Sequence, residues 1–181
     1  MANQSDLRAG DVQDQAQEHD PVVVDAAVSL MPINGEARPI SDWVTVFHLV
    51  MVVLDPYTHE SSWILNTSGR VLRNFAGADC RVAYLVTGTP GEAKSFLGPW
   101  AEEILTFADE DRYVVKALGL QSLPAIVHLD HQLNLRTQAQ GWNPKEWRNF
   151  ANQLSRAMSW HTPLIPAAED PSPFNGTPAL G

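Results

Sequence analysis

The fold is decided by residues 50–66, which read VMVVLDPYTHESSWILN. They continue an apolar run that starts at Val46 and ends at Leu54, and its lack of polar alternation predicts a central strand buried on both faces. A helix is expected next, because Thr58 is a favourable N-cap residue. An apolar stripe at helical spacing supports one helix from 58 to 75, with Ile64, Ser68, Val71, Leu72 and Phe75 on one side. This strand, loop and helix contain no cysteine.

Length and charge restrict the possible classes of protein. The 181 residues are 44% hydrophobic and 18% charged, which suits one globular domain with a substantial core. The net charge of −9 lies mostly in the two ends of the chain, so the middle is only mildly acidic and lacks a basic surface for nucleic acid. No apolar run is long enough to span a bilayer, and the polar, acidic N-terminus is unlike a secretory signal. We therefore expect a cytoplasmic protein that binds neither nucleic acid nor membrane.

Composition divides the chain into three parts. Residues 1–20 are rich in Gln and Asp and are expected to be disordered. Residues 161–181 contain five prolines, which predict an extended tail with no regular helix or central strand. We expect this tail to be a solvated, unordered end; the alternative is that Phe174 and Leu180 anchor it in a groove on this or another protein. The domain itself is predicted at residues 21–160.

Within that domain, strands and helices alternate. Short strands are expected at 27–31, near 37 and at 104–107, and a longer one at 81–87. A capping box at Thr89 opens a helix toward Leu97, and Asp109 caps a helix that ends at Gly119. A hairpin is predicted from strands 123–129 and 133–140, followed by a helix over 143–158 behind a second capping box.

This order, together with the segment LPAIVH at 123–128, resembles the thioredoxin fold. The segment VSLMPINGEARPISDW at 28–43 resembles the opening of peroxiredoxins and of thiol reductases of the alkyl hydroperoxide reductase type. The resemblance implies an α/β three-layer sandwich, in which helices flank a central mixed sheet that carries a short N-terminal β extension.

The resemblance also implies where the reactive site should lie. Pro124 matches the cis-proline that faces this site, and Thr58 and Ser61 stand where such proteins carry cysteines. A hydroxyl cannot replace the thiolate, because the thiolate is the nucleophile in disulfide exchange and peroxide reduction. Glu60 on the first turn would also raise the pKa of a neighbouring thiol. The resemblance therefore predicts the fold without its redox activity.

The one cysteine, Cys80, leaves an alternative open. It excludes an intramolecular disulfide and a multi-cysteine metal site. The predicted helix carries the chain about 25 Å from the reactive end, so we expect Cys80 at the far end of the sheet as a buried apolar residue. The alternative is a thiol oxidoreductase that uses Cys80 or an external thiol, and the sequence leaves enzymatic activity undecided.

Two polar clusters suggest other chemistry. His59 with Ser61 or Ser62 suggests a hydroxyl nucleophile oriented by Glu60, but neighbouring residues on a helix point in different directions. These residues are better explained as a polar first turn, with a weak anion pocket as the alternative. His128, Asp130 and His131 suggest a metal, but no further ligand converges on them. We expect no cofactor and no metal.

The sequence thus favours a redox-inactive protein-binding or assembly module. Its partner is expected to be another protein, with a homodimer as a further possibility. The expected contact surface is the former active-site face, formed by Thr58, His59, Glu60, Ser61, Leu123, Pro124 and Trp142.

Overall fold

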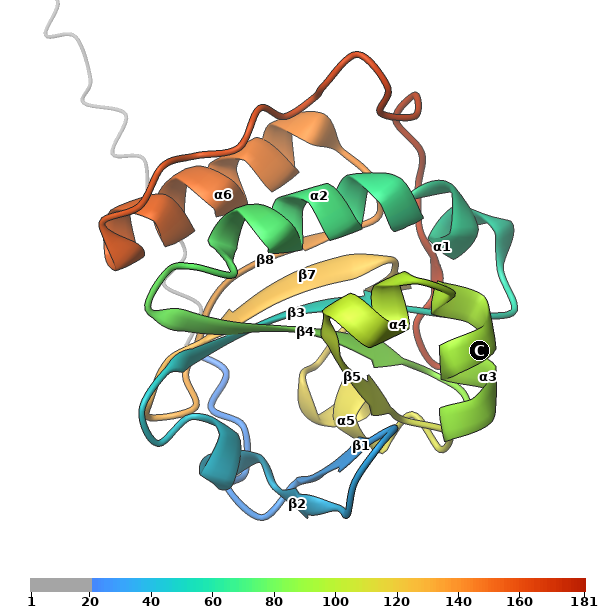
Figure 1. The fold of residues 1–181 in the computed structure, drawn as a ribbon, viewed down its shortest axis with the longest axis vertical. Coiled ribbons are helices and arrows are strands. Elements are labelled where there is room, and N and C mark those ends of the chain that lie inside the picture. Colours follow the sequence, from blue (N-terminus) through green and yellow to red (C-terminus); the bar gives the residue numbers. More distant parts are fainter. Residues whose placement is uncertain (1–20) are drawn as a thin grey trace, which may run out of the picture.

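A computed structural model describes residues 21–181 (Figure 1). The prediction for residues 1–20 lies outside the described residues. Seven strands form one sheet in the spatial order β2-β1-β5-β4-β3-β7-β8. They are β1 (Ser29–Pro32), β2 (Arg38–Pro39), β3 (His48–Leu54), β4 (Cys80–Val86), β5 (Leu105–Ala108), β7 (Ala125–Leu129) and β8 (Leu135–Gln140).

Helices and a short second ribbon complete the fold. The two-stranded ribbon pairs β6 (Ser122–Leu123) with β9 (Thr177–Pro178). The helices are the 3-10 helix η1 (Ile40–Trp43) and the α-helices α1 (His59–Trp63), α2 (Leu65–Phe75), α3 (Pro90–Leu97), α4 (Trp100–Glu103), α5 (Tyr113–Ala117) and α6 (Pro144–Met158).

The sheet is mixed and has a hydrophobic core on each face. β3 at its centre pairs parallel with β4 and antiparallel with β7. Val50, Val52 and Leu54 of β3 pack toward α2 and α6, whereas Met51 and Val53 pack toward α5. Figure 1 shows α2 and α6 side by side over one face. The predicted α/β sandwich with a mixed sheet is confirmed, and β1 and β2 form its β extension beside β5.

The predicted helix over 58–75 is wrong as a single element. It divides at Ile64 into α1 and α2. The Thr58 side chain does not cap α1; its hydroxyl donates to the Asp55 carbonyl at 3.2 Å. Thr58 is therefore positioned by the loop before it rather than by the helix after it.

The boundaries of other elements also differ from the predicted ones. The capping box at Thr89 is confirmed, but Asn143 accepts only from the Lys145 amide and forms no box. Asp109 lies outside α5 and still binds its first turn, accepting from the Val114 and Val115 amides at 3.1 and 2.9 Å. The predicted strand 123–129 breaks at Pro124, which separates β6 from β7. The short helix α4 was not predicted.

The largest correction concerns residues 161–181. They are extended, as the prolines predict, but they are not an unordered end. The tail leaves α6, crosses α2 and passes behind α1 to finish near α3 (Figure 1). Ile165 and Ala179 are buried in the two cores, and β9 pairs with β6. The prediction failed because proline prevents regular structure without preventing packing.

Candidate functional site

The loop between β3 and α1 is held by hydrogen bonds to its own backbone and by an ion pair to Arg112. The Asp55 carboxylate accepts from the Tyr57 amide at 3.0 Å and binds the Arg112 guanidinium at 2.8 Å. The buried Ser61 hydroxyl accepts from the Asp55 amide at 2.9 Å. Ser61, at one of the positions expected for a cysteine, therefore fixes the loop and is not an exposed nucleophile.

His59 and its neighbours do not form a catalytic group. His59 is exposed, and its ring stacks on Trp63 with centroids 6.4 Å apart. The Ser62 hydroxyl donates to the His59 carbonyl at 2.7 Å rather than to an imidazole nitrogen. Within residues 21–181, no hydrogen bond joins the His59 ring to a serine or to Glu60. Hydroxyl activation by a histidine needs such a bond, so the arrangement does not support it.

Pro124 lies at the same end of the sheet as α1. The Leu123–Pro124 peptide bond is cis, and the pairing of Val53 with Ala125 places it beside the end of β3. Both Leu123 and Pro124 are buried. The tail covers them, because Leu123 pairs with Thr177 in the β6–β9 ribbon and its carbonyl also accepts from the Thr177 hydroxyl.

Trp142 is buried under the same tail. The Trp142 and Phe174 backbones exchange two hydrogen bonds of 3.0 Å, and the Trp142 indole N–H donates to the Pro171 carbonyl at 2.8 Å. The side chain is only 1% exposed. Trp142 was expected to contact a partner, whereas in this structure it contacts the chain's own tail.

Two glycines allow the tail to lie this close. A Cβ on Gly176 would come within 2.8 Å of the Leu123 carbonyl oxygen, and one on Gly141 within 2.9 Å of the Gly176 nitrogen. Real Cβ atoms do not approach backbone atoms so closely, so any larger residue would push the tail off this surface.

An ion pair upstream of the ribbon and a hydrogen bond downstream of it hold the tail. Upstream, the Asp170 carboxylate, 3% exposed, binds the Arg70 guanidinium at 2.8 and 2.9 Å and accepts from the Thr67 hydroxyl at 2.8 Å. Downstream, Arg112 donates to the Ala179 carbonyl at 2.7 Å as well as to Asp55. Arg112 thus connects the end of the tail with the loop before α1. Nothing in the sequence relates Arg70 to a residue one hundred positions away.

A polar cavity opens beside the tail at this end. Its volume is about 640 Å³. The ends of β6 and β8, the start of α6 and the tail line it, through Ser122, Gln140, Trp142, Asn143, Glu146, Pro173, Phe174, Asn175 and Gly176. The tail therefore leaves open space beside Trp142 and Gln140.

Cys80 lies at the other end of the sheet, as predicted. It begins β4, whose far end at Val86 pairs with Leu54, so it lies about 20 Å from the Pro124 end at 3.3 Å per residue. The thiol is buried and 3.6 Å from the Phe75 carbonyl oxygen. Burial, and secondarily the charge of Asp79, raises the pKa of the Cys80 thiol to about 11, so it stays protonated and unreactive.

Three histidines lie together near Cys80. The sequence grouped only His128 and His131, and the structure adds His48. His48 Nδ1 and His128 Nε2 share a hydrogen bond of 2.8 Å, and His131 Nδ1 bonds to the Val44 carbonyl at 2.8 Å. The nitrogens of His48 and His128 that face each other are thus already partnered. No group of three His, Cys, Asp or Glu residues within 21–181 is arranged to hold a metal ion.

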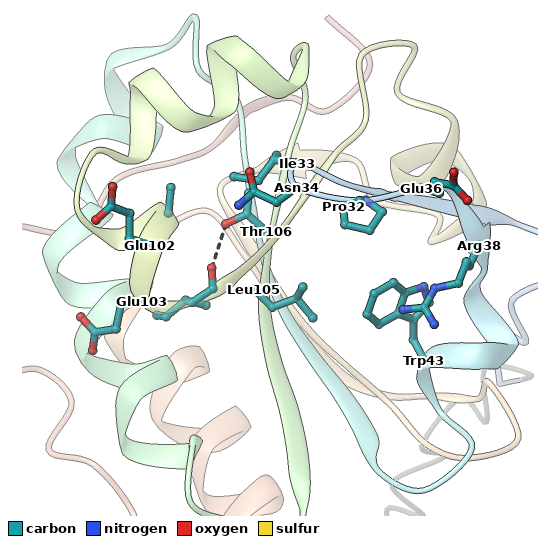
Figure 2. A pocket seen from close by; sticks show the side chains of 13 residues that line it. Pro32, Ile33, Asn34, Glu36, Arg38, Trp43, Glu102, Glu103, Leu105 and Thr106 are labelled. Atoms are coloured by element: carbon teal, nitrogen blue, oxygen red, sulfur yellow. Dashed lines mark hydrogen bonds between the residues drawn. The ribbon is translucent and has the colours of Figure 1, made fainter.

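A second cavity, of about 570 Å³, lies at the β1–β5 edge of the sheet (Figure 2). Arg38 and Trp43 form one wall, with the guanidinium 4.1 Å above the indole, and Glu102 and Glu103 lie opposite. The hydrogen bond to Arg73 lowers the pKa of Glu103, which is therefore held as a carboxylate. The residues that line this cavity include neither Cys80 nor Pro124.

Comparison with known proteins identifies the fold. No family model and no curated protein matches the chain. Among solved structures, a thiol:disulfide interchange protein DsbE from Chlorobium tepidum has a TM-score of 0.62 at 14% identity, over 75% of this chain and 97% of that one. A cysteine-to-serine mutant of PrxQ from Xylella fastidiosa has a TM-score of 0.59 at 16% identity, over 75% and 96%.

A lipoprotein thioredoxin from Streptococcus pneumoniae is also similar, with a TM-score of 0.55 at 15% identity, over 73% of this chain and 97% of that one. Identities this low establish the fold and not the activity. No helix among residues 21–181 combines the length and apolar character that a membrane span needs. The chain therefore has the thioredoxin-like fold and carries no cysteine in the strand, loop and helix where that fold places its reactive thiol.

Proposed function

We propose that the chain is a redox-inactive thioredoxin-like protein that binds another protein at the former active-site face. The absence of a thiol at Thr58 and Ser61 removes the redox chemistry, and the raised pKa of Cys80 provides no substitute for it. What remains at this end of the sheet is a surface with exposed aromatic side chains.

These exposed aromatic side chains are the observation that carries the proposal. Tyr57 and Trp63 are 65% and 54% exposed, and the tail's Phe174 meets Trp63 edge-on with ring centroids 5.4 Å apart. Together with His59, which stacks on Trp63, they form what we call the rim patch. Aromatic residues are enriched at protein interfaces, where burying them contributes much of the binding energy.

The rim patch differs in part from the face expected from sequence. Thr58, His59 and Glu60 keep some exposure, whereas Ser61 is buried. Leu123, Pro124 and Trp142 lie under the tail, so a partner that binds the structure as described meets the rim patch first.

A site-specific crosslinking experiment tests this proposal. A photoreactive benzoylphenylalanine at Trp63 is expected to crosslink a partner protein in native lysate. The same group at Val46, which is 68% exposed in the loop before β3, serves as the matched control. Equal crosslinking at both positions, or none at either, would refute binding at this face. Crosslinks only between copies of the chain would identify a homodimer instead.

The alternative function, a thiol oxidoreductase, is tested separately. We expect no reduction of insulin disulfides or of hydrogen peroxide above the buffer rate, because Cys80 is buried and protonated. Turnover that disappears in Cys80→Ser would support the oxidoreductase and contradict the binding function.

A further inference from the structure

We propose that residues 171–179 are an internal occupant of the former active-site face, and that the protein partner replaces them with an extended segment of similar chemistry. This inference rests on the proposed function and specifies what the partner inserts. It predicts a segment antiparallel to β6, with an aromatic residue two positions before a glycine, as Phe174 precedes Gly176.

The backbone contacts of the tail do not depend on its side chains. The ribbon pairs only Ser122 with Pro178 and Leu123 with Thr177, and Trp142 exchanges backbone hydrogen bonds with residue 174. Any extended peptide that reaches this surface can form such bonds, which is the physical basis of binding by strand addition.

Two positions of the tail give the contact its selectivity. Phe174 packs against Trp63 and the core on the α2 and α6 side. Gly176 passes so close to the Leu123 carbonyl that a Cβ would lie 2.8 Å from it. A replacement segment therefore needs an aromatic side chain at the first position and glycine at the second.

The tail is suited to exchange because the ribbon that holds it has only two residue pairs. Segments held by few backbone contacts open locally at lower free energy than the core. The ion pair between Asp170 of the tail and Arg70 of α2 lies outside the β6–β9 ribbon. It holds the start of the tail in place. The polar cavity beside Phe174 and Gly176 gives an incoming segment room to approach.

Fluorescence anisotropy with a labelled peptide of residues 169–181 tests the exchange on the full-length protein. Wild-type protein should bind the peptide weakly, because its own tail competes. Gly176→Val should remove the internal tail from the face and tighten apparent binding at least about tenfold, since affinity scales with the fraction of open protein. Asp170→Asn loosens the tail at a distance and should give a smaller gain, which keeps the test valid if Gly176→Val does not fold.

The peptide itself carries the matched controls. A peptide with Gly176→Val should not bind either protein, and one with Phe174→Ala should bind at least about tenfold more weakly than the native peptide. No gain in either protein variant, or equal binding of the valine peptide, would overturn the proposal. So would a dimer of the Asp170→Asn protein in sedimentation, because the tail of a second copy, and not another protein, would then occupy the face.

This result is separable from the proposed function. A partner that crosslinks at position 63 while the peptide fails to bind leaves the binding function standing and removes only the exchange of the tail. Peptide binding without any crosslinked partner supports the exchange of the tail and removes the proposed binding function.

Discussion

At one end of the central sheet β3 runs into α1 beside Pro124, and the C-terminal tail closes over both; at the other end Cys80 and three histidines gather where β3 and β4 begin. The end where this fold normally holds its thiol has no cysteine. At the other end the thiol is buried, and His48 and His128 bond to each other, whereas His131 is exposed and bonds to the Val44 carbonyl. The Cys80 thiol is thus kept from the accessible surface, and this burial supports the proposed binding function over the oxidoreductase alternative.

The largest effect is expected from removing the tryptophan under the tail. Trp142→Ala should cost about 3–5 kcal/mol of unfolding free energy, because a fully buried indole and its hydrogen bond to Pro171 are lost. Urea unfolding followed by far-UV circular dichroism measures the loss. The control is Trp63→Ala in the rim patch, where we expect less than about 1 kcal/mol. Similar losses in both variants would contradict the contrast between covered and exposed aromatics.

Acid should destabilise the opposite end of the sheet. Burial, and secondarily the neighbouring His48, lowers the pKa of His128 to about 4. The unfolded chain therefore takes up this proton first, near pH 6.5, so stability is complete above that pH and is lost as pH falls toward 4. The loss should be about 3 kcal/mol.

The control for the acid effect is His128→Gln, which cannot gain that proton. Between pH 7 and 4 the wild-type protein should lose about 3 kcal/mol more unfolding free energy, measured in urea, than His128→Gln does. Parallel curves would show that carboxylates, and not His128, cause the acid sensitivity.

A smaller effect is expected where the tail crosses α2. Arg70→Ala leaves the buried Asp170 carboxylate without its cation and should cost about 2 kcal/mol. Hydrogen exchange of amides 170–179, measured by mass spectrometry, should accelerate at least about tenfold. The control is Arg73→Ala on the same helix, because the Arg73–Glu103 pair is exposed and worth less than about 1 kcal/mol. Unchanged exchange of the tail in Arg70→Ala would show that the ion pair does not hold it.

The smallest effect is expected at the thiol. Cys80→Ser keeps the contact with the Phe75 carbonyl and should cost only about 1 kcal/mol. In the folded wild type the thiol should react with Ellman's reagent at pH 8 far more slowly than in urea, since its pKa is raised. Rapid labelling of the folded protein would place the thiol at an accessible surface and reopen the redox alternative.

Local signals predicted most of the fold. The apolar run before Asp55 gave the central strand, and Thr89 gave a helix start that the structure confirms. Prediction failed where distant contacts decide the outcome. Nothing local indicates that α1 and α2 divide at Ile64, or that Asp170 binds Arg70.

The candidate site shows the same limit. The sequence placed Thr58, Ser61 and Pro124 at one end of the sheet, and the structure places them there. It did not reveal that Ser61 is buried or that Trp142 lies under the tail. The signals for this cover were Phe174 and Leu180, two isolated apolar residues in the tail. Phe174 packs against the core, whereas Leu180 stays exposed.

The sequence by itself determined the alternation of strands and helices and the missing thiol, because these depend on residue type and spacing along the chain. Only the tertiary structure decided which surfaces stay open. Burial of Trp142 and Ala179 depends on a segment that returns from the far end of the chain, and close backbone approach at Gly176 is possible only once that segment is in place.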